Sequence, residues 1–202
     1  MSDVTSELTA DLIMHAANLA AGGHRAPSLS AAQWAALRFF ARANAMSRTP
    51  SAFASFHGTT RGTASQTVKS LVERGYLERQ RSAIDGRRTE LRITPAGERA
   101  LAEDPAGALV RAIDTLSASQ REVLEDVMRR ITAQVDGHCG EATFGVCEDC
   151  AYRDACDDDV GSCQVTGERL QQGDVHQLCY AFAPSGTAQV THSGNNQDPD
   201  TA

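Results

Sequence analysis

One amphipathic segment, TTRGTASQTVKSLVERG at residues 59–75, constrains the fold more than any other part of the chain. Its apolar residues recur at the spacing of one helix face, and Gly75 suits the position that follows a helix. The opposite face is small, polar or basic, so the predicted helix packs by one side only. The apolar face comprises Ala64, Val68, Leu71 and Val72, and the polar face comprises Arg61, Ser65, Gln66 and Lys69.

The residues before this helix predict two more helices. Ser30 is a suitable N-cap for the run AAQWAALRFFARA, and Pro50 suits the first turn of a short helix that Gly58 ends. The apolar residues that we expect in the core are Trp34, Leu37 and Phe40.

The residues after it alternate like two strands, YLERQRSA at 76–83 and TELRITP at 89–95. Leu91 and Ile93 would face one side, Glu90 and Arg92 the other, and the turn between the strands, IDGRR, has a basic tip. The order of these elements predicts a winged helix-turn-helix: a helix, a short helix, a polar-faced helix and a hairpin. The fold class is therefore mainly α with a small β-hairpin wing (α+β).

Charge is unevenly distributed along the chain, whose net charge is −7. Residues 60–99 hold nine Lys/Arg against five Asp/Glu, an excess of +4, whereas residues 137–202 hold two against eleven, or −9. The middle of the chain could therefore face phosphate, while the tail would be repelled by it.

The predicted DNA contacts follow from residue chemistry. Gln66 can bond adenine bidentately, Arg61 or Lys69 can reach guanine or phosphate, and hydroxyls suit phosphate oxygens. Arg87 and Arg88 at the hairpin tip suit a narrow minor groove. The alternative is a small α/β domain in which the polar face of this helix is exposed to solvent and binds no DNA. The candidate DNA-binding residues are Thr60, Arg61, Thr63, Ser65, Gln66, Lys69, Arg87 and Arg88.

The stretch TTRGTASQTVKSLVERGYLERQRSAIDGRRTELRITPAGERAL resembles the recognition helix, wing and following helix of the MarR family. DGRR and ITPAG are its most specific parts, and the resemblance covers about residues 5–136. It implies a homodimer that binds a pseudo-palindromic operator in double-stranded DNA. It also implies that Asp85 orients the wing, that Arg87 is the wing arginine, and that helices at 5–21, 94–115 and 119–136 form the dimer interface.

The expected organisation has five parts. Residues 1–28 form an N-terminal dimerisation helix, 29–98 the winged helix-turn-helix, and 99–136 further dimerisation helices. Residues 137–184 form an irregular Cys-rich segment, and 185–202 a disordered tail. The helix at 94–115 should break near Asp104–Gly107, and Ser119 with Glu122 should form a capping box for the last helix.

Five of the six cysteines lie between Cys147 and Cys179. The first grouping is the run Cys147, Cys150 and Cys156 plus one more ligand, which resembles cluster motifs of FNR and Wbl sensors and of RecB-like nucleases. The second is Cys147, Cys150, Cys163 and Cys179, which resembles the spacing of high-potential iron–sulfur proteins. We prefer the second grouping, with Cys156 as the alternative ligand.

Four thiolates suit zinc or an iron–sulfur cluster. Zinc modules commonly show two tight Cys pairs, whereas this chain has one Cys-x-x-Cys, so we expect a cluster, 4Fe–4S before 2Fe–2S, with zinc as the alternative. His138, His176 and His192 are more readily explained as exposed residues than as ligands. Acidic neighbours such as Asp149 and Asp154 should keep the tail away from DNA.

The resulting hypothesis is a dimeric repressor whose cluster senses redox, nitric oxide or iron status and acts on DNA affinity through the last helix. The alternative is a MarR-like regulator with structural zinc and a small-molecule effector. We expect no enzyme, because the chain lacks paired carboxylates on a strand with a lysine, a phosphate loop and a nucleophile constellation. Without a signal peptide or a membrane-length apolar run, the expected location is the cytoplasm.

Overall fold

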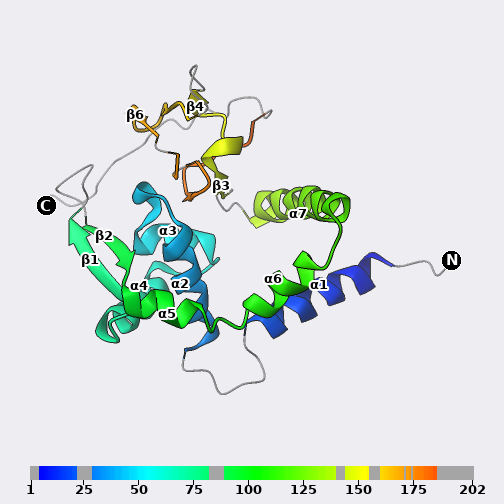
Figure 1. The fold of residues 1–202 in the computed structure, drawn as a ribbon, viewed down its shortest axis with the longest axis horizontal. Helices are drawn as coiled ribbons and strands as arrows, with labels where there is room; N and C mark the ends of the chain where they lie inside the picture. Colours follow the sequence, from blue (N-terminus) through cyan, green and yellow to red (C-terminus); the bar gives the residue numbers. More distant parts are fainter. Residues whose placement is uncertain are drawn as a thin grey trace, which may run out of the picture.

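The computed structural model describes residues 5–21, 29–81, 89–139, 144–154, 160–170, 172–173 and 175–185. The described residues are mainly helical, and a β-hairpin follows the third helix of the helix-turn-helix region, which confirms the predicted fold class (Figure 1). Asp85, Arg87, Arg88, Cys156, His192 and the tail beyond Ser185 lie outside the described residues, so the predictions for them are untested. Within the described part, no helix is both long and apolar enough to cross a bilayer.

The helix-turn-helix begins with α2 (Ala31–Arg42), which Ser30 caps in a reciprocal capping box with Gln33. A short 3-10 helix, η1 (Ala45–Ser47), leads to α3 (Pro50–Phe56), and then to α4 (Arg61–Glu73). Pro50 lies in the first turn of α3, as predicted. Gly75 has φ of 74°, so a residue without Cβ ends α4 at little cost.

The apolar core lies between α2, α3, α4 and the hairpin. Trp34, Leu37 and Phe40 are buried there, as predicted, and Leu71 of α4 packs into the same cluster. Phe39 and Phe53 bring further aromatic rings into the contact between α2 and α3. Burial of these large side chains fixes α3 and α4 against α2 and leaves the polar face of α4 outward.

The wing pairs β1 (Leu77–Arg81) with β2 (Thr89–Ile93) in antiparallel register, from Leu77 opposite Ile93 to Arg81 opposite Thr89. Leu91 is in the core, as the alternation predicted, and its N–H donates to the Arg48 carbonyl at 2.9 Å. Glu90 differs from the simple alternation because it is also buried, with an oxygen 3.3 Å from Arg92 and 3.9 Å from Arg48. Both faces of β2 are therefore covered at this point.

Helix α5 (Pro95–Leu101) and helix α6 (Gly107–Asp114) replace the single predicted helix at 94–115, with the predicted break between them. Asp104 fixes the break, because its Oδ1 accepts from the Ala106 N–H at 2.9 Å and binds Arg38 of α2 at 2.7 Å. Pro105 cannot donate a helical hydrogen bond, which prevents the helix from continuing.

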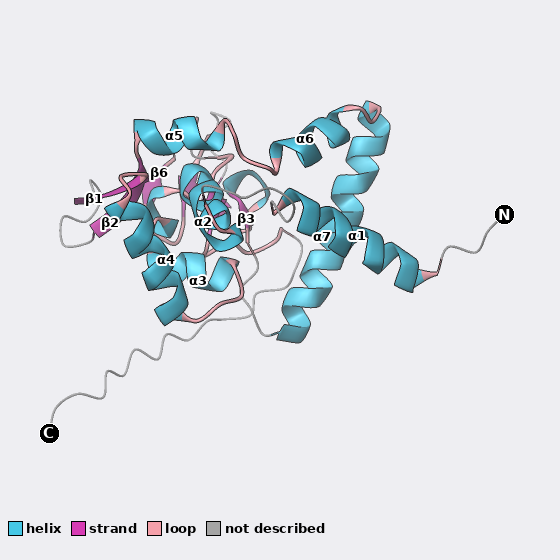
Figure 2. Ribbon diagram, turned by 90° about the horizontal axis from the view of Figure 1, so that it is seen from below, coloured by secondary structure: helices cyan, strands magenta, loops and turns pink. Residues whose placement is uncertain are grey.

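Helix α1 (Ser6–Ala20) contacts α6 and extends away from the winged helix (Figures 1 and 2). Helix α7 (Ala118–Cys139) starts earlier than predicted. The capping box predicted at Ser119 and Glu122 is wrong, since Ser117 and Gln120 exchange the two hydrogen bonds, at 3.3 and 2.9 Å. Both pairs fit the motif, but a cap at Ser117 begins the helix two residues earlier and places Ser119 inside it.

The C-terminal segment was predicted to be irregular, but it contains two small sheets. In the first, β3 (Gly145–Val146) pairs with β7 (Leu178–Cys179), and a 3-10 helix, η2 (Cys147–Asp149), follows β3. The second has the order β4 (Arg153–Asp154), β5 (Ser162–Cys163) and β6 (Glu168–Arg169). Each strand has two residues, too few to show a periodic pattern in the sequence.

We predict that Gly97→Ala destabilises the winged helix by about 1–3 kcal/mol, because the added Cβ would lie 2.4 Å from the Tyr76 carbonyl oxygen and 2.7 Å from Ile93. Gly62→Ala, also in a first helical turn, is the matched control, since its Cβ meets only Thr60 at 3.9 Å. It should be neutral or stabilising by up to about 1 kcal/mol. Thermal unfolding measures both, and equal melting temperatures for the two variants would contradict the packing argument.

Candidate DNA-binding surface and cysteine site

Helix α4 presents the predicted reading face to solvent. Arg61, Ser65, Gln66 and Lys69 are all exposed, while Ala64, Val68 and Leu71 are buried on the other side. Lys69 lies 3.9 Å from Glu73, and both side chains are 64% exposed, so this ion pair leaves the ammonium accessible.

Two hydroxyls that we predicted as phosphate contacts also have a local structural function. The Thr60 Oγ1 caps α4 by accepting from the Thr63 N–H at 3.1 Å, and the two hydroxyls lie 2.9 Å apart. Both side chains remain exposed. They therefore hold the start of the helix at the surface beside Arg61.

Four cysteines from separate parts of the C-terminal segment line one small cavity. Cys147, Cys150 and Cys179 are buried, and Cys163 is half-buried; all four are free thiols. They form the grouping that we preferred from spacing. Within the described residues, no group of three or more His, Cys, Asp or Glu side chains is arranged to hold one metal ion. The structure thus places the four thiols around a common cavity and does not itself assign them a ligand.

Most of the other residues that line this cavity are apolar. Val165, Leu170 and Ala181 line the same cavity, together with Tyr152 and Arg153. An apolar lining limits solvent access to a bound group and so influences its redox potential.

The thiols of Cys147 and Cys179 are coupled by a hydrogen bond. This bond lowers the pKa of Cys179 to about 6 against the opposing effect of burial, and hydrogen bonds from the Asn44 side chain, the Ala181 backbone and the Ser47 side chain lower it further. The pKa of Cys147 is raised, first by the same hydrogen bond and then by burial. The hydrogen bond therefore favours ionisation of Cys179 over ionisation of Cys147.

The same strand that carries Cys179 docks on the connection between α2 and α3. On one side of Cys179, the Leu178 carbonyl accepts from the Asn44 N–H at 2.9 Å, and on the other side the Tyr180 N–H donates to the Ser47 Oγ at 2.9 Å. Leu178 also forms a parallel bridge with Ala43 and packs against the core. Cys179 is thus held directly against the helix-turn-helix.

Phe144 provides the apolar part of this docking. Its ring meets Phe56 of α3 edge to face at 5.1 Å and Phe39 of α2 at 6.4 Å between centroids. Edge-to-face aromatic pairs add about 0.5–1.5 kcal/mol to the energy of area burial. The C-terminal segment therefore contacts both helices that precede the reading helix.

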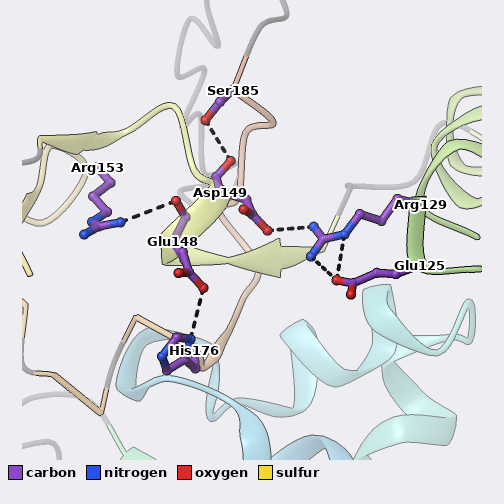
Figure 3. A network of polar contacts seen from close by, with 7 residues as sticks. All are labelled: Glu125, Arg129, Glu148, Asp149, Arg153, His176 and Ser185. Atoms are coloured by element: carbon purple, nitrogen blue, oxygen red, sulfur yellow. Dashed lines mark hydrogen bonds and ion pairs between the residues drawn. The ribbon is translucent and has the colours of Figure 1, made fainter. Parts of the chain in front are cut away.

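A polar network joins the segment to α7 (Figure 3). Arg129 of α7 binds the Asp149 carboxylate at 2.7 Å and the Glu125 carboxylate at 2.7 Å. These bonds raise the pKa of Arg129, the Glu125 hydrogen bond most strongly. The Ser185 hydroxyl donates to the Asp149 carbonyl at 2.9 Å, which fixes the end of the described segment to the same turn.

The same turn carries a second pair, between the His176 Nδ1 and the Glu148 carboxylate at 3.2 Å. His176 is 68% exposed and is not among the residues that line the cavity, as we expected for this histidine. The side chain of His138 lies outside the described part of the structure.

Sequence reasoning missed Asn44, Ser47 and Phe144. Asn44 and Ser47 lie far from the cysteines in the sequence, and their own neighbourhood shows only that Asn44 caps η1. Phe144, an aromatic residue just before the Cys-x-x-Cys, gave the one local signal that this segment packs against something apolar.

Residues 28–88 match the sequence model of the MarR family. The match covers the winged helix-turn-helix and less than a third of the chain. Two solved structures share the fold. The S. aureus MepR–DNA complex matches at 15% identity and TM-score 0.51, over 67% of this chain and 99% of that one. A MarR/EmrR family transcriptional regulator from Acinetobacter sp. ADP1 matches at 17% identity and TM-score 0.50, also over 67% of this chain and 99% of that one.

The PcaV transcriptional regulator from Streptomyces coelicolor, in complex with its natural ligand, matches at 24% identity and TM-score 0.46, over 66% of this chain and 96% of that one. About a third of this chain extends beyond what it shares with MepR and with the Acinetobacter regulator. No curated protein sequence matches the chain with comparable significance.

We predict that Phe144→Ala loosens the C-terminal segment from the MarR-like domain and lowers stability by about 2 kcal/mol, roughly half the cost of truncating a fully buried Phe. Phe144→Leu, which keeps apolar volume, is the control and should cost clearly less. Hydrogen–deuterium exchange at the Asn44 and Tyr180 amides measures docking. Unchanged protection of both amides in Phe144→Ala would contradict the proposed anchor.

We predict that Asn44→Ser raises the pKa of Cys179 in the reduced, metal-free protein. Serine caps a helix about as well as asparagine but is too short to reach the thiolate, so one stabilising hydrogen bond is lost. Wild-type protein should show a thiolate appearing near pH 6 by ultraviolet absorbance, and the variant should show it at higher pH. Cys179→Ser identifies the signal by removing it, and identical titrations of wild type and Asn44→Ser would contradict the assignment.

Proposed function

We propose that the chain is a MarR-like, dimeric, DNA-binding transcriptional repressor whose C-terminal cysteines bind an iron–sulfur cluster of the 4Fe–4S type. In this proposal, redox, nitric oxide or iron status sets the affinity for the operator. The position of Cys179 carries the proposal. This residue lines the cysteine cavity, and its neighbours Leu178 and Tyr180 are hydrogen-bonded to Asn44 and Ser47 beside the helix-turn-helix.

Three observations support DNA binding. Residues 28–88 match the MarR family, and the fold resembles that of MepR in its complex with DNA. The exposed face of α4 carries Arg61, Gln66 and Lys69, which suit base edges and phosphates. In a helix-turn-helix, the N-terminal end of the second helix enters the major groove, and here that end carries Arg61.

Exposed apolar side chains on α1, α6 and α7 support the dimer. Met14 of α1 and Val123 of α7 are each 63% exposed, and Val110 of α6 is 56% exposed. Large apolar side chains in such numbers are costly in water and mark interaction surfaces. The same three helices are those that the family resemblance places in the dimer interface, and α1 has no buried residue within one chain.

The chemistry of the cysteine cavity fits an iron–sulfur cluster. Cys147, Cys150, Cys163 and Cys179 would provide four thiolates, and hydrogen bonds to sulfur of the kind that Cys179 receives are known to tune cluster potentials. When bound, such a cluster would supply a reversible electron-transfer couple and a target for oxidants and nitric oxide. Four thiolates are also the donor set of structural zinc, which is the alternative proposal.

The contacts favour a shorter route to DNA than the one we expected from the sequence. The hypothesis of action through the last helix retains support from the bond between Arg129 and Asp149. However, Asn44 and Ser47 connect Cys179 to the start of α3, and α3 packs on α4. Any shift of Cys179 therefore displaces the residues that position the reading helix within the same protomer.

The decisive experiment is an anaerobic purification of the full chain followed by iron, acid-labile sulfide and zinc analysis. We expect a coloured protein with iron and sulfide in equal amounts, and operator affinity that differs between the loaded and the metal-free protein. A colourless protein with one zinc per chain would support the alternative. Equal affinity in both forms would reduce the cysteine site to a structural function.

Single serine substitutions identify the ligands. Substitution of Cys147, Cys150, Cys163 or Cys179 should abolish the visible absorbance, whereas Cys139→Ser and Cys156→Ser should retain it. The latter two variants are matched controls from the same acidic part of the chain. Loss of absorbance in Cys156→Ser, with retention in Cys163→Ser, would establish the other grouping.

A further inference from the structure

Tyr180, next to the proposed ligand Cys179, lines a surface groove that belongs mostly to the helix-turn-helix. The groove has a volume of about 560 Å³ and runs between α3, the first residue of α4 and the C-terminal segment. Ser51 and Ser55 of α3, Thr59 and Arg61 line it together with Tyr180. The appended segment therefore contributes a side chain to the surface on which α4 begins.

The position of Tyr180 is fixed by the backbone. Its N–H donates to the Ser47 Oγ at 2.9 Å, and the carbonyl of Leu178, two residues earlier, accepts from the Asn44 N–H at 2.9 Å. The Tyr180 side chain is 39% exposed. The hydrogen bonds on both sides of Cys179 hold this part of the chain in place. The Tyr180 phenol is therefore not needed for docking and can contact a ligand at the surface.

The chemistry of the groove suits a phosphate. Arg61 supplies a positive charge, Ser51, Ser55 and Thr59 supply hydroxyls, and Tyr180 supplies a phenol donor. Of the described residues that line the groove, none is acidic. Guanidinium groups together with neutral hydroxyl donors are the set with which proteins contact DNA backbone oxygens.

We propose that Tyr180 donates a hydrogen bond to a DNA backbone phosphate in this groove, beside Arg61. The inference rests on the proposed DNA-binding function, because the start of the second helix in a helix-turn-helix lies at the major groove, and the flanking groove then follows the phosphate backbone. It makes the cysteine segment part of the DNA-binding surface. Any change at Cys179 then acts on a DNA contact at the adjacent residue.

The test compares Tyr180→Phe with Tyr76→Phe, which removes a hydroxyl from a tyrosine outside the groove. The probe is a labelled duplex of random sequence, since a backbone contact does not depend on the operator. Binding is measured with the loaded full-length protein over a range of salt concentrations. Iron and sulfide contents of each variant confirm that the cysteine site is unchanged.

We expect Tyr180→Phe to weaken binding by about tenfold or more, as for one lost hydrogen bond to a charged acceptor, without changing the salt dependence because the phenol is neutral. Arg61→Gln should weaken binding and reduce the salt slope by about one. The double variant should lose less than the product of the two effects, because both groups contact the same phosphate. Tyr76→Phe should bind like wild type.

Two results would overturn the contact while leaving the proposed function in place. One is wild-type affinity in Tyr180→Phe, and the other is a multiplicative loss in the double variant. Unchanged DNA affinity together with weaker binding of a small anion such as benzoate would assign the groove to a small molecule instead. Failure of wild-type protein to bind duplex DNA under any condition would overturn the proposed function itself, and the contact with it.

Discussion

The docking of strand β7 on the connection between α2 and α3 determines the relation between the two halves of this chain. Hydrogen bonds lie on both sides of Cys179, one from the Asn44 N–H to the Leu178 carbonyl and one from the Tyr180 N–H to the Ser47 Oγ. Buried backbone groups must find partners, so these bonds constrain the strand to a single register. That register holds Cys179 against the helix-turn-helix, packs Leu178 against its core and leaves Tyr180 partly exposed at the surface.

The local elements of the MarR-like domain could be predicted from the sequence because their signals are local. Ser30, Pro50 and Gly75 mark helix ends within a few residues of the helices that they limit, and the apolar face of α4 repeats at the helical period. The same reasoning placed a capping box at Ser119, where two overlapping matches to one motif compete. The structure selects Ser117 because the helix begins at Ala118.

The position of the cysteine segment could not be predicted, because its contacts join residues far apart in the chain. Ser47 and Tyr180 are 133 residues apart, and no periodicity connects them. The resemblance of the cysteine spacing to that of iron–sulfur proteins had grouped Cys147, Cys150, Cys163 and Cys179, and these four line the cavity; Cys156, the alternative ligand, lies outside the described residues. The net negative charge of the segment suggested distance from DNA, yet two of its carboxylates, on Glu148 and Asp149, are bound to His176 and Arg129. Charge averaged over a segment therefore does not report which face it presents.

Two connections link the cysteine segment to the rest of the protein, and their physical strengths differ. The bond between Arg129 and Asp149 lies at the surface, with side chains 51% and 43% exposed. Exposed ion pairs contribute about 0–1 kcal/mol and weaken further with salt. The contacts of Phe144 and Leu178 with the core are apolar, and the bonds from Asn44 and Ser47 are shielded by that packing. These apolar contacts and shielded hydrogen bonds depend on ionic strength less than the exposed ion pair does. In the proposed function, a change at the cysteine cavity would therefore be transmitted more strongly to α3 and α4 than to α7. The proposed dimer interface would then not need to rearrange for α4 to respond.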